Sequence, residues 1–277
     1  MKLDGSVSRL KGASSNVSNA ISFLQVQDGL LESAGNIVAR MGELKGLYAD
    51  VLKSSSDQDT YDSEFADLQS QLYDLATTKF NGVAVFGDLN DANGNAGTSN
   101  ANSKVFGTNN SDVLNSLEVY ISEDGSSGSS VTVHQTLLLS ALTLNTASNN
   151  ANATWAETNT NVGDGNGVKS GTYTIAVATP AKAMSLDDLD SDFLTSALEN
   201  LATARANNGG QVSRLQYAQD NLESQITNMT AAYGRIMDVD VAQESANLAK
   251  QQILVQASAA MTAQAKSSTE VALMLLQ

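Results

Sequence analysis

Cysteine is absent from the 277-residue chain, and histidine occurs once, at His134. Without cysteine the protein has no disulfides, no thiolate nucleophile and no zinc site built on thiolates. A lone histidine in a β-prone run, with no acidic motif beside it, is not the pattern of a catalytic base. Phosphate-binding glycine loops and nucleophile elbows are also missing. We therefore expect no enzyme activity, no cofactor and no metal site.

Basic residues are scarce, because 15 Lys and Arg stand against 30 Asp and Glu, for a net charge of −15. Phosphate binding needs clustered Lys and Arg, so neither nucleic acid nor an anionic membrane surface is an expected partner. No apolar run is long enough to span a bilayer, and no membrane insertion is expected. The start, Met1 to Asp4, lacks the apolar segment of a cleaved secretory signal. We expect a cytosolic protein, one exported without a cleaved signal, or one that has lost its natural start.

The last third of the chain, from about Ser185 to Gln277, contains a long heptad repeat. Its seam residues recur at alternating intervals of three and four, a period typical of one long helix packed along another. The repeat consists of Leu198, Leu201, Arg205, Asn208, Val212, Leu215, Gln219, Leu222, Ile226, Met229, Tyr233 and Ile236. A helix of this length cannot cover its own seam, so it needs partner helices.

The front of the chain provides two such helices. A heptad register runs over residues 20–52, and a second set of apolar residues widens its stripe, so this helix should contact more than one neighbour. The widening residues are Leu30, Ile37, Leu44 and Val51. A second helix is expected near residues 61–75, after a serine-rich break where Ser56 and Asp59 have the spacing of a capping box. Next, Asn81-Gly82 between β-prone residues predicts a type I′ hairpin.

Residues 88–184 differ in composition from both ends. The tract 88–103 has the Asn, Asp, Gly and Ser content of a loop, and short β-prone runs follow at 117–122, 131–135 and 172–179. A capping-box pattern at Ser185–Asp188 then restarts the helix. We expect a mainly α fold, an antiparallel bundle or coiled coil of long helices with a β-hairpin and a small β-rich insert. The expected domains are 1–87, 88–184, 185–237 and 238–277.

Both ends of the chain resemble the bacterial flagellins. At the front, Gly29 through Arg40, Glu43 and Leu44 resembles the long first helix of the flagellin core, and Phe80-Asn81-Gly82-Val83 matches its hairpin. At the back, residues 235–244, 251–257 and 273–276 resemble the junction between the core helices and the terminal inner helix. The resemblance covers roughly residues 1–86 and 186–277. The hook–filament junction protein shares these helices, but the C-terminal ending argues against it.

The resemblance implies a structural subunit that self-assembles into the flagellar filament for motility. It would be secreted without a cleaved signal and would lie in the extracellular flagellum or on the cell surface. The implied partners are other flagellin subunits, an export chaperone and the filament cap. Candidate assembly residues are Leu30, Ile37, Arg40, Glu43, Leu44, Arg235, Asp238, Asp240, Ile253 and Leu254. A Toll-like innate-immune receptor recognises some flagellins around the position of Arg40, but Gly42 stands here in place of a second Arg, which argues against that partner.

Flagellins begin with a further inner helix that pairs with the C-terminal one, so the chain resembles a shortened flagellin. Residues 238–277 carry alanines where bulky seam residues would stand, and we expect this segment to be loosely ordered or to pack on a neighbouring chain. The alternative function is a flagellin-like adhesin or glycan-binding protein. Its insert would contact surface ligands, with Trp155 and Tyr173 as candidate stacking residues.

Overall fold

The computed structural model describes residues 2–87, 106, 115–145, 151–152, 172–237 and 241–274. The chain forms two compact units, one of Ser8–Gln225 and one of Met1–Val7 with Ile226–Gln277. Long helices dominate the described residues, which confirms the expected mainly α fold. These helices are α1 (Lys2–Tyr48), α2 (Ser55–Ala76), α4 (Ser191–Met237) and α5 (Val241–Met274).

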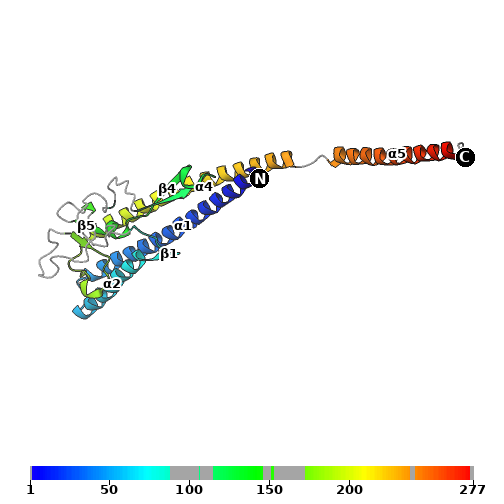
Figure 1. Ribbon diagram of the computed structural model, residues 1–277. Coiled ribbons are helices and arrows are strands. Elements are labelled where there is room, and N and C mark those ends of the chain that lie inside the picture. The colour runs from blue at the N-terminus through cyan, green and yellow to red at the C-terminus, as the bar shows by residue number, and fades with distance from the viewer. Residues whose placement is uncertain are drawn as a thin grey trace. The chain divides into compact units, whose positions relative to one another are not determined.

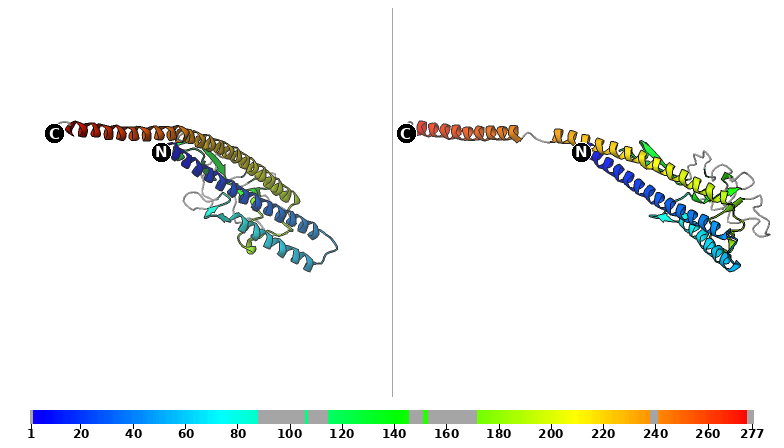
Figure 2. Two further views of the ribbon diagram at one scale, coloured as in Figure 1. Left: turned by 90° about the vertical axis from the view of Figure 1, so that its right-hand side faces the viewer. Right: turned by 180° about the vertical axis from the view of Figure 1, so that it is seen from behind.

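Within the larger unit, α1 lies between α2 and α4 (Figures 1 and 2). Its contacts with α4 run antiparallel: Leu24 is bonded to Asn208, Asp28 to Arg205, and Gly42 lies beside Leu194. The central position explains the wide apolar stripe of α1, because one face packs on α2 and another on α4.

The heptad seam of α4 is confirmed over its buried part. Leu201, Asn208, Leu215 and Leu222 are each at most 2% exposed. The helix runs through Asn207-Asn208-Gly209-Gly210 without interruption. Leu198, also placed in the seam by its spacing, is 37% exposed and lies at the edge of the contact.

Helix α2 begins with a capping box, two residues earlier than the spacing of Ser56 and Asp59 suggested. Ser54 has an extended backbone and accepts a hydrogen bond from the Asp57 amide, and the Asp57 carboxylate accepts one in return from the Ser54 amide. Ser56 is already inside the helix. The cap predicted at Ser185 is wrong, for a different reason.

Ser185 does not cap a helix, because α2 binds this segment instead. The Asp62 carboxylate accepts hydrogen bonds from the Ser185 hydroxyl and the Leu186 amide, both at 2.8 Å. Helix α4 therefore begins later, at Ser191. A tertiary contact overrides the local capping preference here.

The short strands form three small antiparallel sheets among the described residues. The Asn-Gly hairpin is confirmed: β1 (Lys79–Phe80) pairs with β2 (Val83–Ala84), and Asn81 and Gly82 have positive φ angles of 50° and 83°. The β3–β4 hairpin (Ser116–Tyr120 with Ser130–His134) confirms two further runs. The third sheet has β5 (Thr143–Asn145) between β6 (Ala151–Asn152) and β7 (Thr172–Thr174), and short α3 (Leu138–Ala141) precedes it.

Amide side chains of the helices fasten these β segments in place. The Gln69 side chain accepts a hydrogen bond from the Met184 amide (3.0 Å) and donates one to its carbonyl (2.7 Å). Gln211 makes the same pair of bonds with the backbone of His134 on β4. Gln27 donates to the Val85 carbonyl, just after the Asn-Gly hairpin. Each bond satisfies a backbone group of a strand end or of a loop.

The capping box of α2 makes stability depend on pH. Hydrogen bonds from the Ser54 hydroxyl, and then from its amide, lower the pKa of Asp57. The stabilisation should therefore be complete above the range where a free aspartate titrates, and should be lost as the pH falls through the lowered pKa. We expect Asp57→Ala to lower the melting temperature at neutral pH and to match the wild type in strong acid. Asp59→Ala, a control in the same turn, should have a smaller effect at neutral pH; an equal effect would contradict the cap.

Candidate assembly surfaces

Helix α5 exposes large apolar side chains on several sides. Every residue from 242 to 267 is exposed. The apolar ones are Leu248 (59% exposed), Ile253 (65%), Leu254 (53%), Val255 (66%) and Met261 (76%). At 3.6 residues per turn, Leu248 and Val255 share one face, Leu254 and Met261 a second, and Ile253 a third. A helix that exposes large apolar side chains on several sides is suited to contact with more than one protein neighbour.

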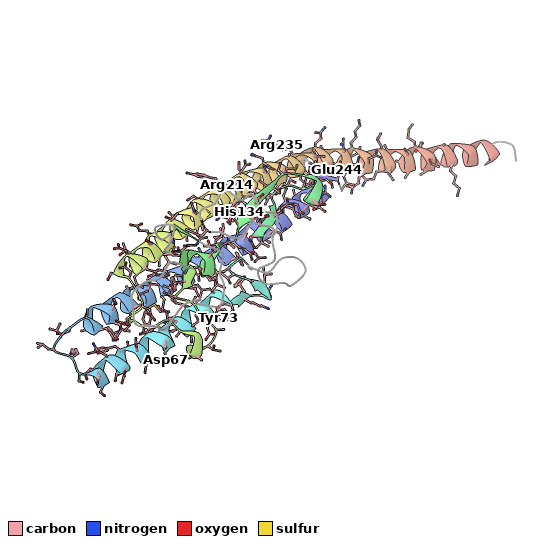
Figure 3. The ribbon with its side chains drawn as sticks, turned by 90° about the vertical axis from the view of Figure 1, so that its left-hand side faces the viewer. Asp67, Tyr73, His134, Arg214, Arg235 and Glu244 are labelled. Carbon is pink, nitrogen blue, oxygen red and sulfur yellow. The ribbon has the colours of Figure 1, made fainter. Side chains whose placement is uncertain are left out.

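The junction before α5 is also exposed where it is described. Arg235 lies in the last turn of α4 and Glu244 in the first turn of α5 (Figure 3). Ile236 and Met237 beside Arg235 are 69% and 56% exposed. The candidates Asp238 and Asp240 lie outside the described residues.

The candidate residues of α1 divide by burial. Leu44 is fully buried, so its side chain serves the subunit's own core, while Leu30 and Ile37 are half-buried. Arg40 and Glu43 are exposed. The Arg40 guanidinium donates to Glu64 of α2 at 2.8 Å and to Glu43 at 2.9 Å, and these hydrogen bonds, that of Glu64 first, raise its pKa. Arg40 and Glu43 therefore present an ion-paired cluster.

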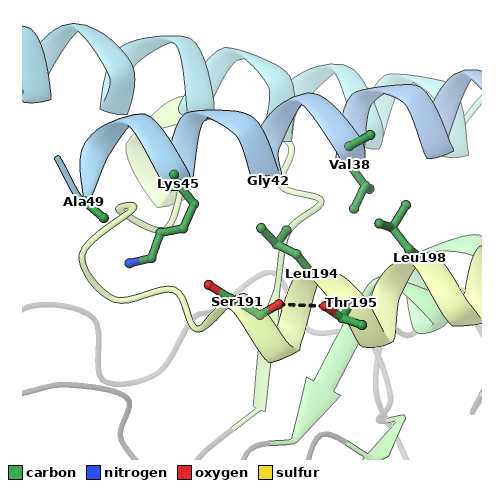
Figure 4. Close-up of a pocket in the computed structure, with 10 residues that line it drawn as sticks. Val38, Gly42, Lys45, Ala49, Ser191, Leu194, Thr195 and Leu198 are labelled. Atoms are coloured by element: carbon green, nitrogen blue, oxygen red, sulfur yellow. Dashed lines mark hydrogen bonds between the residues drawn. The ribbon is translucent and has the colours of Figure 1, made fainter.

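A groove of about 320 Å³ lies between α1 and α4, where α1 carries Gly42 and Gly46 (Figure 4). Leu194 and Leu198 form its other wall, and Thr195 turns its hydroxyl back to the Ser191 carbonyl. The groove is open here because Gly42 has no side chain. A Cβ at this position would meet only Leu194 Cδ1, at 4.0 Å.

Of the two candidate ligand-stacking residues, Tyr173 is described and has no surface position. Tyr173 is on β7 and only 4% exposed, so its ring belongs to the small core of the insert and is not available to a surface ligand. Burial of Ile175, Ala176 and Val177 beside it shows that this run packs on both faces. Trp155 lies outside the described residues. His134 lies alongside α4, held there through its backbone (Figure 3).

Sequence reasoning missed part of the exposed set on α5. Leu248, Val255 and Met261 accompany the candidates Ile253 and Leu254. The available signal was that polar and apolar residues are not separated onto two faces of this helix. Over the residues that the structure describes, no group of His, Cys, Asp or Glu could hold a metal ion, and no helix combines the length and apolar content needed to cross a bilayer.

Comparisons with known proteins cover both ends of the chain. The model of the bacterial flagellin N-terminal helical region matches residues 1–91, and that of the bacterial flagellin C-terminal helical region matches residues 192–276. Together they match more than half of the chain.

Relatives align along the whole chain. Flagellin FlaB1 of Treponema pallidum (strain Nichols) is 24% identical over 276 residues, covering 100% of this chain and 82% of that protein. The flagellar filament 33 kDa core protein of Treponema phagedenis is 26% identical over 288 residues, with the same coverage of 100% and 82%. The crystal structure of Bacillus cereus flagellin aligns at a TM-score of 0.42 and 20% identity, over 79% of this chain and 94% of that one.

Two glycines should respond oppositely to alanine. Gly42→Ala adds a methyl group that makes only an ordinary contact with Leu194 Cδ1, at 4.0 Å, in a helix interior, so we expect a gain of about 1 kcal/mol in the free energy of unfolding. At Gly87 a Cβ would lie 2.8 Å from Leu137 Cδ2, so Gly87→Ala should cost about 1–3 kcal/mol. Urea unfolding measures both; a loss at Gly42 would mean that the groove needs its glycine.

The exposure of α5 predicts weak protection of its backbone. Most helical stability in proteins comes from a packed face, which residues 242–267 lack in the single chain. In dilute solution their amides should exchange hydrogen for deuterium much faster than those of residues 194–222 of α4. Equal protection of the two segments would show that α5 is stable without a partner.

Proposed function

The chain belongs to the bacterial flagellin family and is a structural subunit of the flagellar filament, and we propose that α5 is the helix through which one subunit binds the next. The observation that carries the proposal is the set of large apolar side chains that α5 exposes on three faces. Burying one such side chain contributes about 1.5–3 kcal/mol. Because five such side chains are exposed in the single chain, burying them against neighbours would strongly favour association.

The geometry of such a contact favours a polymer. Every copy exposes the same α5, and a helix with apolar side chains on three faces needs more than one neighbour to cover them. If α5 of one copy packs on a different surface of the next, the contact is heterologous and repeats without closing unless the rotation closes a ring. Open helical growth of this kind produces a filament.

We propose that α1 supplies a second, weaker contact surface. Its half-buried Leu30 and Ile37 leave part of each side chain for a neighbour. The ion-paired Arg40, Glu43 and Glu64 fix a rigid polar cluster nearby on α1 and α2. Exposed ion pairs contribute little affinity, but they penalise misaligned neighbours through unpaired or like charges.

The subunit charge should make assembly depend on salt. Each chain carries a net charge of −15, so subunits repel one another at low ionic strength. Screening removes this repulsion, since the Debye length falls to roughly 10 Å at 0.1 M salt. Excluded salts such as sulfate also strengthen apolar burial, which is the attraction that α5 offers.

The family places the assembled subunit in the extracellular flagellar filament and implies further partners. We propose that an export chaperone covers the apolar faces of α5 before assembly, and that the filament cap meets the subunit as it is added. Recognition by a Toll-like receptor is not proposed, because Gly42 departs from the receptor-binding pattern. The flagellin family is structural, and no catalytic role is proposed.

Charged substitutions on α5 test the assembly role. We expect Ile253→Glu or Leu254→Glu to abolish elongation of flagellin seeds under salting-out conditions, because a carboxylate cannot be buried unpaired. Sedimentation and electron microscopy measure elongation. The melting temperature should not change, since these side chains are exposed in the single chain.

Gln251→Glu adds the same charge on the same helix without removing an apolar side chain, so it serves as the matched control. It should still elongate seeds, with at most a shift to higher salt. If Ile253→Glu and Leu254→Glu elongate seeds as well as this control does, α5 is not the assembly helix.

A further inference from the structure

Arg214 and Tyr217 lie one turn apart on α4 and take no part in the subunit's own packing. Tyr217 is 76% exposed, and no other aromatic side chain in the part of the chain that the structure describes is classed as exposed. Arg214 is exposed as well and makes no ion pair with a described residue. Tyrosine and arginine are among the side chains that most often anchor protein interfaces. This pair, the α4 anchor, therefore has the composition of a contact surface.

The α4 anchor lies in a stretch of helix that carries no carboxylate. Over residues 200–219 the only charged side chains are Arg205 and Arg214. Arg205 already has partners, because its guanidinium donates to Asp28 and to Glu32, both at 3.1 Å. Arg214 therefore remains as an unpaired cation on the surface of an acidic protein. A surface of negative charge is its complementary partner.

The outer face of α2 has this complementary charge. Helix α2 contains six Asp and Glu residues and no Lys or Arg. Its buried side, which includes Phe65 and Leu72, faces the interior of the unit. At 3.6 residues per turn, Asp67, Gln71 and Asp74 lie on the opposite side, and all three are exposed. Neither Asp67 nor Asp74 makes an ion pair with a described residue. These three residues form the α2 stripe.

The α4 anchor and the α2 stripe lie on opposite sides of the larger unit. Figure 3 shows Asp67 at one edge and Arg214 at the other, with α1 between the two helices. One subunit therefore cannot bring its own anchor and stripe together. Each surface needs another copy of the chain to supply its partner.

The two surfaces also differ in their position along α1. The hydrogen bond of Arg40 to Glu64 places α2 against α1, and that of Arg205 to Asp28 places α4. Counted from these bonds at 1.5 Å per residue, the centres of the stripe and the anchor are about 24 Å apart along the helix axes. Copies joined through these surfaces would be staggered by this distance.

We infer that the α4 anchor of one subunit packs on the α2 stripe of a second copy. Both α2 and α4 run antiparallel to α1, so they are parallel to each other in copies of the same orientation. The anchor then fits between the two carboxylates, with Arg214 toward Asp67 and Tyr217 toward Asp74. The guanidinium pairs with one carboxylate, and the tyrosine hydroxyl donates a hydrogen bond to the other.

This contact extends a row of subunits. It joins two different surfaces, so each added copy leaves one anchor and one stripe free for the next, and the stagger makes the row rise as it grows. A symmetric contact of anchor with anchor would instead bring two Arg214 side chains together, and like charges penalise it. The inference rests on the assembly proposed above, because a small polar contact does not hold two free subunits together and adds to that made by α5.

A charge swap tests the inference in assembly driven by ammonium sulfate. Arg214→Glu and Asp67→Lys should each reduce the sedimented fraction about tenfold, because each places like charges in contact. The double variant should assemble as the wild type does. Lys11→Glu, with the same charge change as Arg214→Glu on exposed α1, is the control and should assemble. Arg214→Glu with Asp50→Lys has the net charge of the double variant and should not recover.

Crosslinking gives a direct readout that does not require long filaments. The chain has no cysteine, so Gly210→Cys and Ser63→Cys, both exposed and one turn before Arg214 and Asp67, place one thiol in each surface. A short bis-maleimide reagent should link concentrated subunits that carry both thiols into a ladder of multimers. Subunits that carry either thiol alone should remain unlinked.

Absence of the ladder, or failure of Asp67→Lys to restore Arg214→Glu, would overturn the inference. Neither result bears on α5, whose role is tested separately by Ile253→Glu. If Ile253→Glu assembles normally while the charge swap and the ladder behave as expected, the assembly role of α5 is wrong and the contact between anchor and stripe stands.

Discussion

The antiparallel seam of α1 and α4 is the constraint on which the rest of the larger unit depends. Each helix alone would expose its buried apolar side chains to water, and the contact between the two covers both sets. The remaining elements attach to this pair by specific polar bonds. Gln211 holds β4, Gln27 holds the chain after the Asn-Gly hairpin, and α2 binds the other face of α1 and the segment before α4. Apolar burial stabilises the helix pair, and the side-chain hydrogen bonds fix where the other elements lie on it.

Much of this arrangement was predictable, because its signals are local. Heptad spacing predicts the long helices, and Asn81-Gly82 predicts a turn that needs two positive φ angles. The predictions fail where contacts between segments far apart in the sequence determine the structure. The Ser185 hydroxyl donates a hydrogen bond to the Asp62 carboxylate, so Ser185 does not cap a helix as the local sequence predicts. Strand β5 was missed because its partner β7 lies far along the sequence and its own three residues carry no alternation.

The candidate assembly surface shows the same division. The terminal helix was identified from its motifs, but an apolar stripe does not say which of its residues the subunit itself covers. Leu44 and Leu30 look alike in the sequence, yet the first is buried in the subunit core and the second only in part. Tyr173 is a candidate stacking residue by sequence, whereas in the structure it is buried by a sheet that pairs segments far apart in the chain.

The contrast between the two ends of the structure explains how folding and assembly can be kept apart. The unit Ser8–Gln225 satisfies its seam internally, so it can fold before any neighbour arrives. Helix α5 does not, and a helix with no covered face is only marginally ordered in water. If subunits bind one another through α5, as we propose, its full ordering would coincide with binding, and the entropy cost would weaken the first contacts between free subunits. Under the same proposal, a filament end that offers several neighbours at once would favour growth there over spontaneous association of free subunits.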